Sequence, residues 1–167
     1  MHTRLKALII GGVMAASLPI GLLGTSAAQA SVAPSPTACS QNSCSFKDPT
    51  LTYLQNTNPR AFCNAGAQDV SDLPNGEPAL GGLLELRYGP NCGTNWTRFT
   101  PGNNDKYEIW VTRLSDGQWA GTGFETPFIF SNDSGVPAYS DQVYSPGPAA
   151  ACVRDITTNS PDVCFNQ

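Results

Sequence analysis

The chain has 167 residues, with nine Lys and Arg against 13 Asp and Glu, so its formal net charge is −4, and it contains a single histidine. This length corresponds to about one domain. Binding to nucleic acid or to an anionic membrane needs clustered basic side chains, so the acidic balance argues against both kinds of partner.

The first thirty residues have the layout of a secretory signal peptide. Two basic residues near the start are followed by an apolar or small-residue segment over 7–23 and by a small-residue cleavage motif, Ala-Gln-Ala, at 28–30. An uncleaved membrane anchor is the alternative interpretation, but the apolar run is short for a membrane span. We therefore expect residues 1–30 to be removed and the exported chain to begin at Ser31.

Removal of this segment changes the chemistry that the chain can perform. It leaves 137 residues with seven basic and 13 acidic side chains, and it takes away His2, the only histidine. Without histidine, neither a Ser-His-Asp or Cys-His triad nor a histidine-bearing zinc or copper site can be built. Loop oxygens of Asn103, Asp105 and Glu108 could bind calcium, although turns favour such residues without any metal. We expect no cofactor and no metal site.

All six cysteines lie in the exported part of the chain. An even number of cysteines in a secreted protein predicts three disulfides. Metal ligation and a thiol nucleophile are the alternatives. No two cysteines form a Cys-x-x-Cys pair, and no histidine remains as a partner, so disulfides are the better interpretation. Sequence alone does not decide which cysteines pair.

The exported chain begins with an expected flexible leader over 31–38, rich in Pro, Ser and Ala, and continues as one domain over 39–167. Polar turns dominate up to residue 82. Strand patterns then alternate apolar with polar side chains and are separated by turn residues. The expected strands lie at 84–88, 96–100, 107–114, 118–120, 128–130 and 142–144. Short strands at this spacing indicate an all-β domain, either a small antiparallel β-sandwich or a partly open barrel, loop-rich and stapled by disulfides.

The segment 83–100 concentrates charged and aromatic residues in an otherwise weakly charged chain. On paired strands, Glu85 and Arg87 would share a face and Arg98 would lie opposite them, as a polar brace on the outer face of a sheet. The sharper hypothesis is a recognition surface, because arginine and aromatic side chains are enriched where proteins bind. Its candidate binding residues are Tyr88, Arg87, Trp96, Arg98 and Trp110.

The same residues carry a resemblance to a known family. The motifs are Cys44-x-x-Lys47-Asp48-Pro49, Cys63, Glu85-Leu86-Arg87-Tyr88 followed by Cys92, Trp96 and Arg98, and Ala151-Cys152. Together they resemble the YjfA-like family of small secreted proteins from Gram-positive bacteria, over about residues 39–152. The chain departs from the family pattern at Gly89, at Ser45-Phe46, and in continuing to Cys164. The resemblance implies export and a small β fold, and it implies no catalytic residue.

The resemblance also implies a disulfide pattern. Cys44, Cys63, Cys92 and Cys152 match the core of the family and are expected to pair among themselves, as Cys44–Cys63 and Cys92–Cys152. The two remaining cysteines are then expected to join the ends of the domain as Cys39–Cys164.

The resulting functional hypothesis is a secreted, non-catalytic binding module for cell-wall glycan or another exported protein. We expect it to be a monomer that does not insert into the membrane after signal cleavage. One alternative is a protease inhibitor that presents the segment 133–150 as a rigid loop. Another is a small hydrolase that uses two carboxylates, for which Glu85 and Asp105 are candidates.

Overall fold

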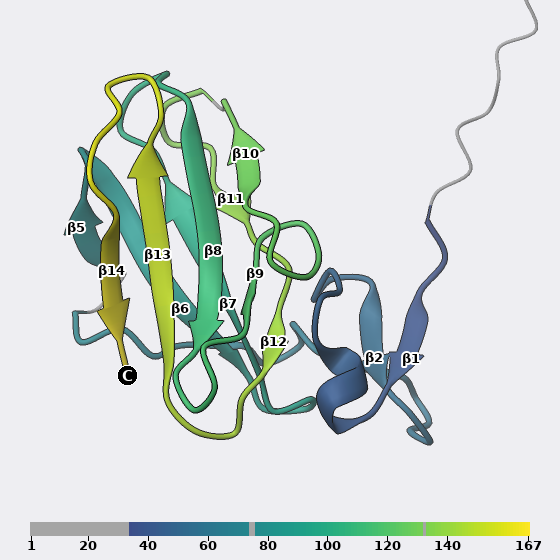
Figure 1. The fold of residues 1–167 in the computed structure, drawn as a ribbon. Coiled ribbons are helices and arrows are strands. Elements are labelled where there is room, and N and C mark those ends of the chain that lie inside the picture. The colour runs from purple at the N-terminus through teal and green to yellow at the C-terminus, as the bar shows by residue number, and fades with distance from the viewer. Residues whose placement is uncertain (1–33, 74–75, 132) are drawn as a thin grey trace, which may run out of the picture. The chain divides into compact units, whose positions relative to one another are not determined.

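The computed structural model describes residues 34–73, 76–131 and 133–167. The expected signal peptide and the start of the leader therefore lie outside the described residues. The described part contains no α-helix and one short 3₁₀-helix, η1 (Gln41–Cys44). None of its helices is long and apolar enough to span a membrane. The predicted all-β class is confirmed (Figure 1).

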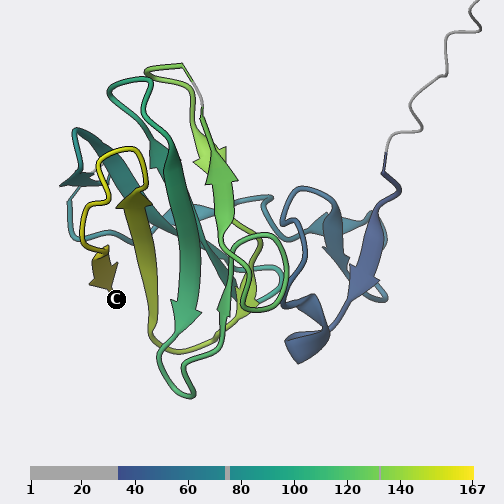
Figure 2. The same ribbon diagram turned by 45° about the horizontal axis from the view of Figure 1, so that its top comes forward.

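Two antiparallel sheets form a sandwich, and neither closes into a barrel (Figures 1 and 2). The first has the order β11-β7-β6-β4, with β12 also on β7 and β5 also on β6. Its strands are β4 (Gln68–Asp69), β5 (Glu77–Ala79), β6 (Gly82–Gly89), β7 (Thr94–Thr100), β11 (Ala138–Tyr139) and β12 (Val143–Tyr144). The second has the order β10-β8-β13-β14, with β9 also on β8. Its strands are β8 (Tyr107–Arg113), β9 (Trp119–Ala120), β10 (Phe128–Phe130), β13 (Ala149–Asp155) and β14 (Val163–Asn166).

A third, small sheet is built by the N-terminal segment, which we define as residues 34–73. Its strands are β1 (Thr37–Cys39), β2 (Thr52–Leu54) and β3 (Ala61–Phe62). β1 pairs with β2 in parallel, whereas β2 and β3 are antiparallel. Strand β1 begins at Thr37, so the last two residues of the expected leader belong to this sheet.

The core lies between the two larger sheets. Leu84, Leu86 and Phe99 from β6 and β7 are fully buried, as are Ile109 and Val111 from β8. These positions alternate with outward-facing residues along each strand, which is the pattern that predicted the strands. The hydrophobic effect on these alternating positions therefore holds the two sheets face to face.

Strand β13 was not predicted from the sequence. It lies between β8 and β14 and pairs with β8 over seven positions, from Ala149 to Asp155. Three of its residues are alanines, which are depleted in strands, so the sequence pattern is weak. Burial explains why this segment nevertheless forms a strand. Ala151 and Val153 are fully buried against the other sheet, where small side chains allow close packing.

The disulfides differ from the pattern that the family resemblance implied. The observed pairs are Cys39–Cys44, Cys63–Cys92 and Cys152–Cys164. The expected pairs Cys44–Cys63, Cys92–Cys152 and Cys39–Cys164 are wrong. Local geometry is the reason: Cys152 and Cys164 lie directly opposite on β13 and β14, with Cα atoms 4.1 Å apart. Helix η1 turns the chain so that the Cα atoms of Cys39 and Cys44 lie 4.9 Å apart.

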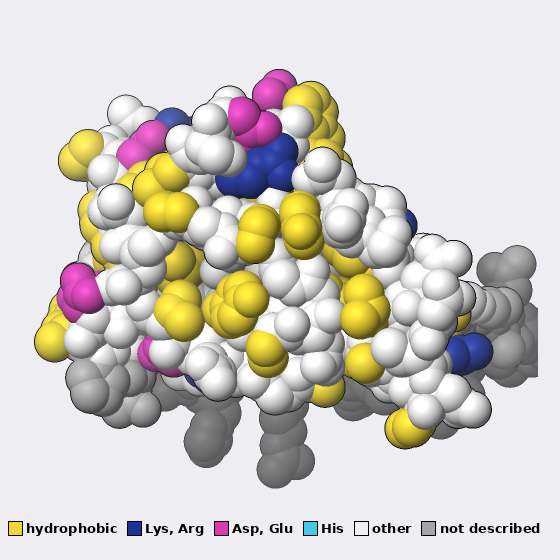
Figure 3. All heavy atoms as spheres, turned by 90° about the horizontal axis from the view of Figure 1, so that it is seen from below, with side chains coloured by type: hydrophobic (Ala, Val, Ile, Leu, Met, Phe, Trp, Pro, Cys, Tyr) yellow, Lys and Arg dark blue, Asp and Glu magenta, His cyan; other side chains and the backbone are white. Residues whose placement is uncertain are grey.

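Exposed apolar side chains are scattered over the described surface. On the face seen from below in Figure 3, hydrophobic side chains form small groups among polar ones, and basic side chains lie beside acidic ones. The large apolar side chains that remain exposed come from well-separated segments: Leu73, Leu83, Leu114, Phe124, Ile129, Val136 and Tyr139. Single exposed apolar residues are normal on a soluble protein and define no docking surface by themselves.

Candidate functional site

The charged residues of β6 and β7 lie together on the outer face of the first sheet. Glu85 pairs with Arg98 and Arg87 pairs with Trp96 in the strand register, which places all four side chains on the face opposite the core. Arg98 Nη1 lies 2.7 Å from Glu85 Oε2, and Arg87 Nη1 lies 3.3 Å from Glu85 Oε1. The arrangement predicted for this brace is confirmed.

This face is covered, whereas the sequence pattern predicts a brace on an exposed outer face. Only 4% of the Glu85 surface is accessible. The N-terminal segment lies across the strands: Arg87 Nη2 donates to the carbonyl of Ala67 at 3.1 Å, and Asn91 Nδ2 donates to the carbonyl of Phe62 at 2.9 Å. The two arginines remain partly accessible, with 22% exposure for the side chain of Arg87 and 32% for that of Arg98.

Burial sets the electrostatics of this cluster. Desolvation raises the pKa of Glu85 above its ordinary value, and the positive charges of Arg98 and Arg87 oppose this rise. Asp69, opposite Arg87 on β4, adds a smaller contribution that raises the pKa further. The ion pairs therefore offset part of the cost of burying Glu85 and hold both guanidinium groups in place.

Two hollows adjoin along the edge where the N-terminal segment meets the sandwich. The smaller has a volume of about 270 Å³ and the larger about 470 Å³. Thr50 and Tyr139 line both of them, so we treat the two as one groove, named here the Tyr139 groove. Its polar and aromatic lining is Asp48, Thr50, Asn64, Arg87, Trp96, Arg98, Thr122, Phe128, Tyr139, Ser140 and Asp141.

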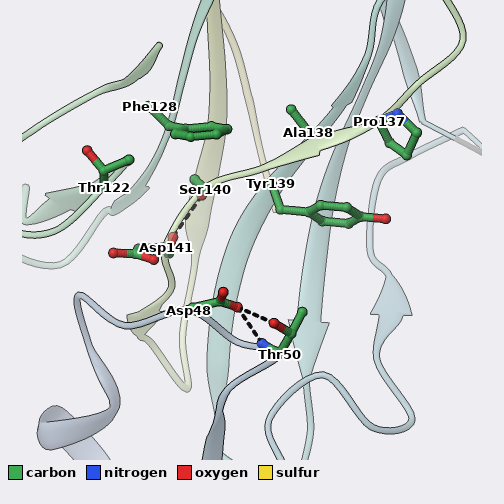
Figure 4. Close-up of a pocket in the computed structure, with 10 residues that line it drawn as sticks. Asp48, Thr50, Thr122, Phe128, Pro137, Ala138, Tyr139, Ser140 and Asp141 are labelled. Atoms are coloured by element: carbon green, nitrogen blue, oxygen red, sulfur yellow. Dashed lines mark hydrogen bonds between the residues drawn. The ribbon is translucent and has the colours of Figure 1, made fainter. Parts of the chain in front are cut away.

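Two carboxyl groups mark the acidic end of the groove (Figure 4). An isolated antiparallel bridge between Lys47 and Gln142 aligns the two chain segments, so Asp48 and Asp141 are the neighbouring residues just beyond that bridge. Gln142 is fully buried and anchors its segment, since its side chain accepts from Thr94 Oγ1 at 2.8 Å and donates to the carbonyl of Cys44 at 2.9 Å.

These two carboxyl groups have different surroundings. Asp48 Oδ1 accepts hydrogen bonds from the backbone N–H of Thr50 at 2.7 Å and from its hydroxyl at 2.6 Å. Burial and, to a smaller extent, the negative charge of Asp48 raise the pKa of Asp141 to about 6, while a hydrogen bond from the backbone of Gly123 acts against the rise. Asp141 therefore exchanges its proton in a range where ordinary aspartates are already ionised.

An exposed aromatic ring lies between the acidic end and the arginines. Tyr139 is 44% exposed, and the guanidinium carbon of Arg98 lies 5.8 Å from the centre of its ring. In Figure 4 the rings of Phe128 and Tyr139 lie on the opposite side of the hollow from Asp48 and Thr50. The groove thus combines aromatic faces with hydroxyl, carboxyl and guanidinium groups.

The five candidate binding residues do not form one surface. Arg87, Trp96 and Arg98 line the Tyr139 groove. Tyr88 lines a separate hollow of about 280 Å³, because successive residues of β6 point to opposite faces. Trp110 lies on the second sheet, with its ring 6.3 Å from that of Trp119, in a third hollow of about 290 Å³.

Sequence reasoning missed the residues Asp48, Tyr139 and Asp141 as parts of a site. Asp48 belongs to a segment whose pattern predicts a turn, and its hydrogen bonds to Thr50 show that it does form one. Tyr139 and Asp141 are separated from Asp48 by about ninety residues of chain. The Lys47–Gln142 bridge and the neighbouring hydrogen bonds of Gln142 to Cys44 and Phe46 bring them together, and nothing in the local sequence signals these contacts.

Comparisons of the chain with protein-family models, with curated proteins and with solved structures find no match. The fold and the groove define the described part of the chain as a disulfide-braced β-sandwich with a polar and aromatic groove at the edge of its N-terminal segment.

Proposed function

We propose that the protein is a secreted, non-catalytic binding module whose ligand occupies the Tyr139 groove. The observation that carries this proposal is an exposed aromatic ring, Tyr139, between a pair of carboxyl groups and a pair of guanidinium groups. Glu85 already holds Arg87 and Arg98 in place, so a ligand would not have to order them. Preorganised groups of this kind reduce the free-energy cost of binding.

The ligand class that best fits this lining is a glycan. A sugar ring offers an apolar face to an aromatic side chain, hydroxyl donors to carboxylates, and oxygen acceptors to arginine. The two hollows of about 470 Å³ and 270 Å³ match the size of small-molecule sites. Cell-wall glycan is the candidate that an exported protein would meet. The exposed large apolar side chains come from well-separated segments of the described chain, which favours this class over a large protein partner.

Binding to insoluble cell-wall glycan and to chitin tests the proposal. The mature protein at about 10 μM should be retained, and Tyr139→Ala should bind at least about tenfold more weakly, a loss of about 1.4 kcal/mol. Leu114→Ala is a matched control, because Leu114 is also 44% exposed and does not line the groove. Absence of retention, or equal binding by Tyr139→Ala and wild type, would reject the glycan site.

A second candidate is a small carboxylate-dependent hydrolase, which the adjacent carboxyl groups of Asp48 and Asp141 favour. With a pKa of about 6, Asp141 would be able to act as a general acid near neutral pH. Neither of the carboxylates considered from the sequence lines the groove: Glu85 is held by two arginines, and Asp105 accepts a hydrogen bond from Asn103 in an exposed turn. Turnover of a polysaccharide panel that disappears in Asp141→Asn would establish this activity, and binding without turnover would dismiss it.

The protease-inhibitor alternative receives less support. An inhibitory loop has to project from its scaffold, whereas much of 133–150 is packed along β7. Ala138, Ser140 and Val143 are buried, and β11 and β12 both pair with β7. The direct test of this alternative measures the residual activity of subtilisin-like and trypsin-like proteases in the presence of a molar excess of the protein.

We also propose that the chain is exported and related to the YjfA-like family. The Glu85–Arg98 motif supports the relationship, and three disulfides fit an oxidising compartment. N-terminal sequencing of the protein from culture medium should read Ser-Val-Ala-Pro, beginning at Ser31. Recovery in the membrane fraction alone, with the first residue intact, would contradict export with cleavage.

A further inference from the structure

Two of the three disulfides lie in contact with each other. The Sγ atoms of Cys39, Cys44, Cys63 and Cys92 all lie within 4.8 Å of one another. Across the two bonds, the Sγ atoms of Cys39 and Cys63 are 3.9 Å apart. All four cysteines are buried, with exposures of 4% or less, and Leu54 packs against them. The third disulfide, Cys152–Cys164, is not part of this sulfur cluster.

We propose that these four sulfurs form a closed zinc site when the two disulfides are reduced. Tetrahedral zinc with Zn–S bonds of about 2.3 Å holds its sulfur ligands about 3.8 Å apart. The contact of 3.9 Å between Cys39 and Cys63 already matches that separation. The bonded pairs have to open, and the widest pair has to approach by about 1 Å, which side-chain rotation can supply.

The chemistry balances with a dithiol reductant. Each disulfide takes up two electrons and two protons, so reduction of both converts two equivalents of dithiol into its cyclic disulfide and leaves four protein thiols. Binding of Zn²⁺ then releases four protons and leaves four thiolate ligands on the metal. Reoxidation needs two equivalents of a small-molecule disulfide, which take up the four electrons and become four thiols or thiolates as the two protein disulfides re-form and the ion is expelled.

The position of the sulfur cluster means that a change between the disulfide-bonded and the zinc-bound state would affect the structure. Cys39, Cys44 and Cys63 belong to the N-terminal segment, and Cys92 follows β6 in the turn to β7. In the oxidised state the Cys63–Cys92 bond joins that segment to the sheet, and in the zinc-bound state all four sulfurs would join them through the metal. Because all four ligands come from the protein, no coordination position stays open, and the metal would have a structural role.

Anaerobic metal binding tests the proposal. The Cys152→Ser/Cys164→Ser variant, which keeps only the cluster, is reduced with a dithiol, freed of reductant and mixed with ZnCl₂. Native mass spectrometry should show one zinc ion per chain. CoCl₂ should give the visible absorption of a tetrahedral tetrathiolate site. The Cys39→Ser/Cys44→Ser variant should lose at least about 100-fold in zinc affinity.

Circular dichroism of the reduced protein shows whether a failure to bind zinc results from misfolding. If the reduced chain loses structure, zinc should restore the spectrum of the oxidised protein in the variant that keeps the cluster. Failure of that variant to retain zinc would overturn the proposal. Equal retention by the Cys39→Ser/Cys44→Ser variant would also overturn it, because binding would then not need the four sulfurs together.

Discussion

Glu85 occupies an unusual position for a charged residue in a small protein. It is nearly inaccessible, and its carboxylate faces the guanidinium groups of Arg87 and Arg98. The free energy lost by desolvating one carboxylate is offset in part by two partners that themselves remain partly in water. Removing Arg98, which lies 2.7 Å from Glu85 Oε2, leaves the buried carboxylate with less compensation.

Arg98→Gln should therefore lower the free energy of unfolding at neutral pH by about 2 kcal/mol, measured by urea or thermal unfolding. Asp162→Asn provides the control, because Asp162 is an exposed partner of Arg154 at 3.8 Å, and its loss should cost less than about 1 kcal/mol. Equal effects of the two substitutions would show that the covering segment contributes nothing to the strength of the brace.

Asp141 makes a specific contribution to the pH dependence of stability. Its pKa is about 6 in the folded protein against an ordinary value of 3.8, so the folded state binds the proton more tightly than the unfolded state. Stability from this group is therefore present at acidic pH and decreases as pH rises from about 4 to about 6. At pH 7 the ionised Asp141 destabilises the fold by about 1–2 kcal/mol, after allowance for partial solvent access.

Asp141→Asn should consequently be about 1–2 kcal/mol more stable than wild type at pH 7 and equally stable at pH 4. Unfolding curves at several pH values measure this difference. The raised pKa of Glu85 acts in the same direction, but it is present in both proteins and cancels. Asp133→Asn, at an exposed position, should retain the wild-type pH profile. A constant difference between Asp141→Asn and wild type at all pH values would refute the assigned cause.

At the scale of elements, the contact between β6 and the N-terminal segment determines the groove. β6 ends at Gly89, where a Cβ atom would lie 2.2 Å from the carbonyl oxygen of Cys63 and 2.9 Å from the ring of Trp96. No left-handed backbone is involved at this glycine; the requirement is space. The segment can approach the sheet this closely only because position 89 has no side chain.

Gly89→Ala should push the N-terminal segment away from β6 and lower the free energy of unfolding by about 1–3 kcal/mol. It should also weaken any ligand of the Tyr139 groove, since Thr50 and Asn64 would move relative to Arg87. Gly147→Ala is the matched control, because a Cβ atom there meets nothing within 4 Å; its stability should stay within about 0.5 kcal/mol of wild type. Wild-type stability of Gly89→Ala would contradict the packing argument.

At the scale of the whole molecule, the disulfides close loops of different lengths. Cys63–Cys92 spans 29 residues and Cys39–Cys44 spans five. Loop entropy alone assigns about 3.5 kcal/mol to the former and about 2 kcal/mol to the latter. The Cys63–Cys92 bond also joins the N-terminal segment to the sandwich.

Cys63→Ser/Cys92→Ser should therefore destabilise the protein more than Cys39→Ser/Cys44→Ser, by about 1.5 kcal/mol. Chemical unfolding of the two oxidised variants gives the comparison, and peptide mapping without reductant verifies the remaining bonds. The reverse order of stabilities would mean that native packing around η1, rather than loop length, controls the contribution of each bond.

The sequence predicts some strands and side-chain positions of this protein and not others, for a physical reason. Alternation along 84–88 and 107–114 predicted β6 and β8 because burial on one face leaves a local period of two. The same local logic placed Glu85, Arg87 and Arg98 on one face. Strand β13 was not predicted, because its alanines have little intrinsic strand preference and its position depends on neighbours distant in sequence.

The amino-acid sequence by itself determined the all-β class, the number of cysteines available for disulfides, and the Glu85 brace. These depend on composition and on residues close together in the chain. Tertiary structure decided the disulfide pairing, the burial of Glu85 and the meeting of Asp48 with Asp141. Each of these depends on how the N-terminal segment folds back on the sandwich, and such long-range contacts are set by the packing of the whole domain.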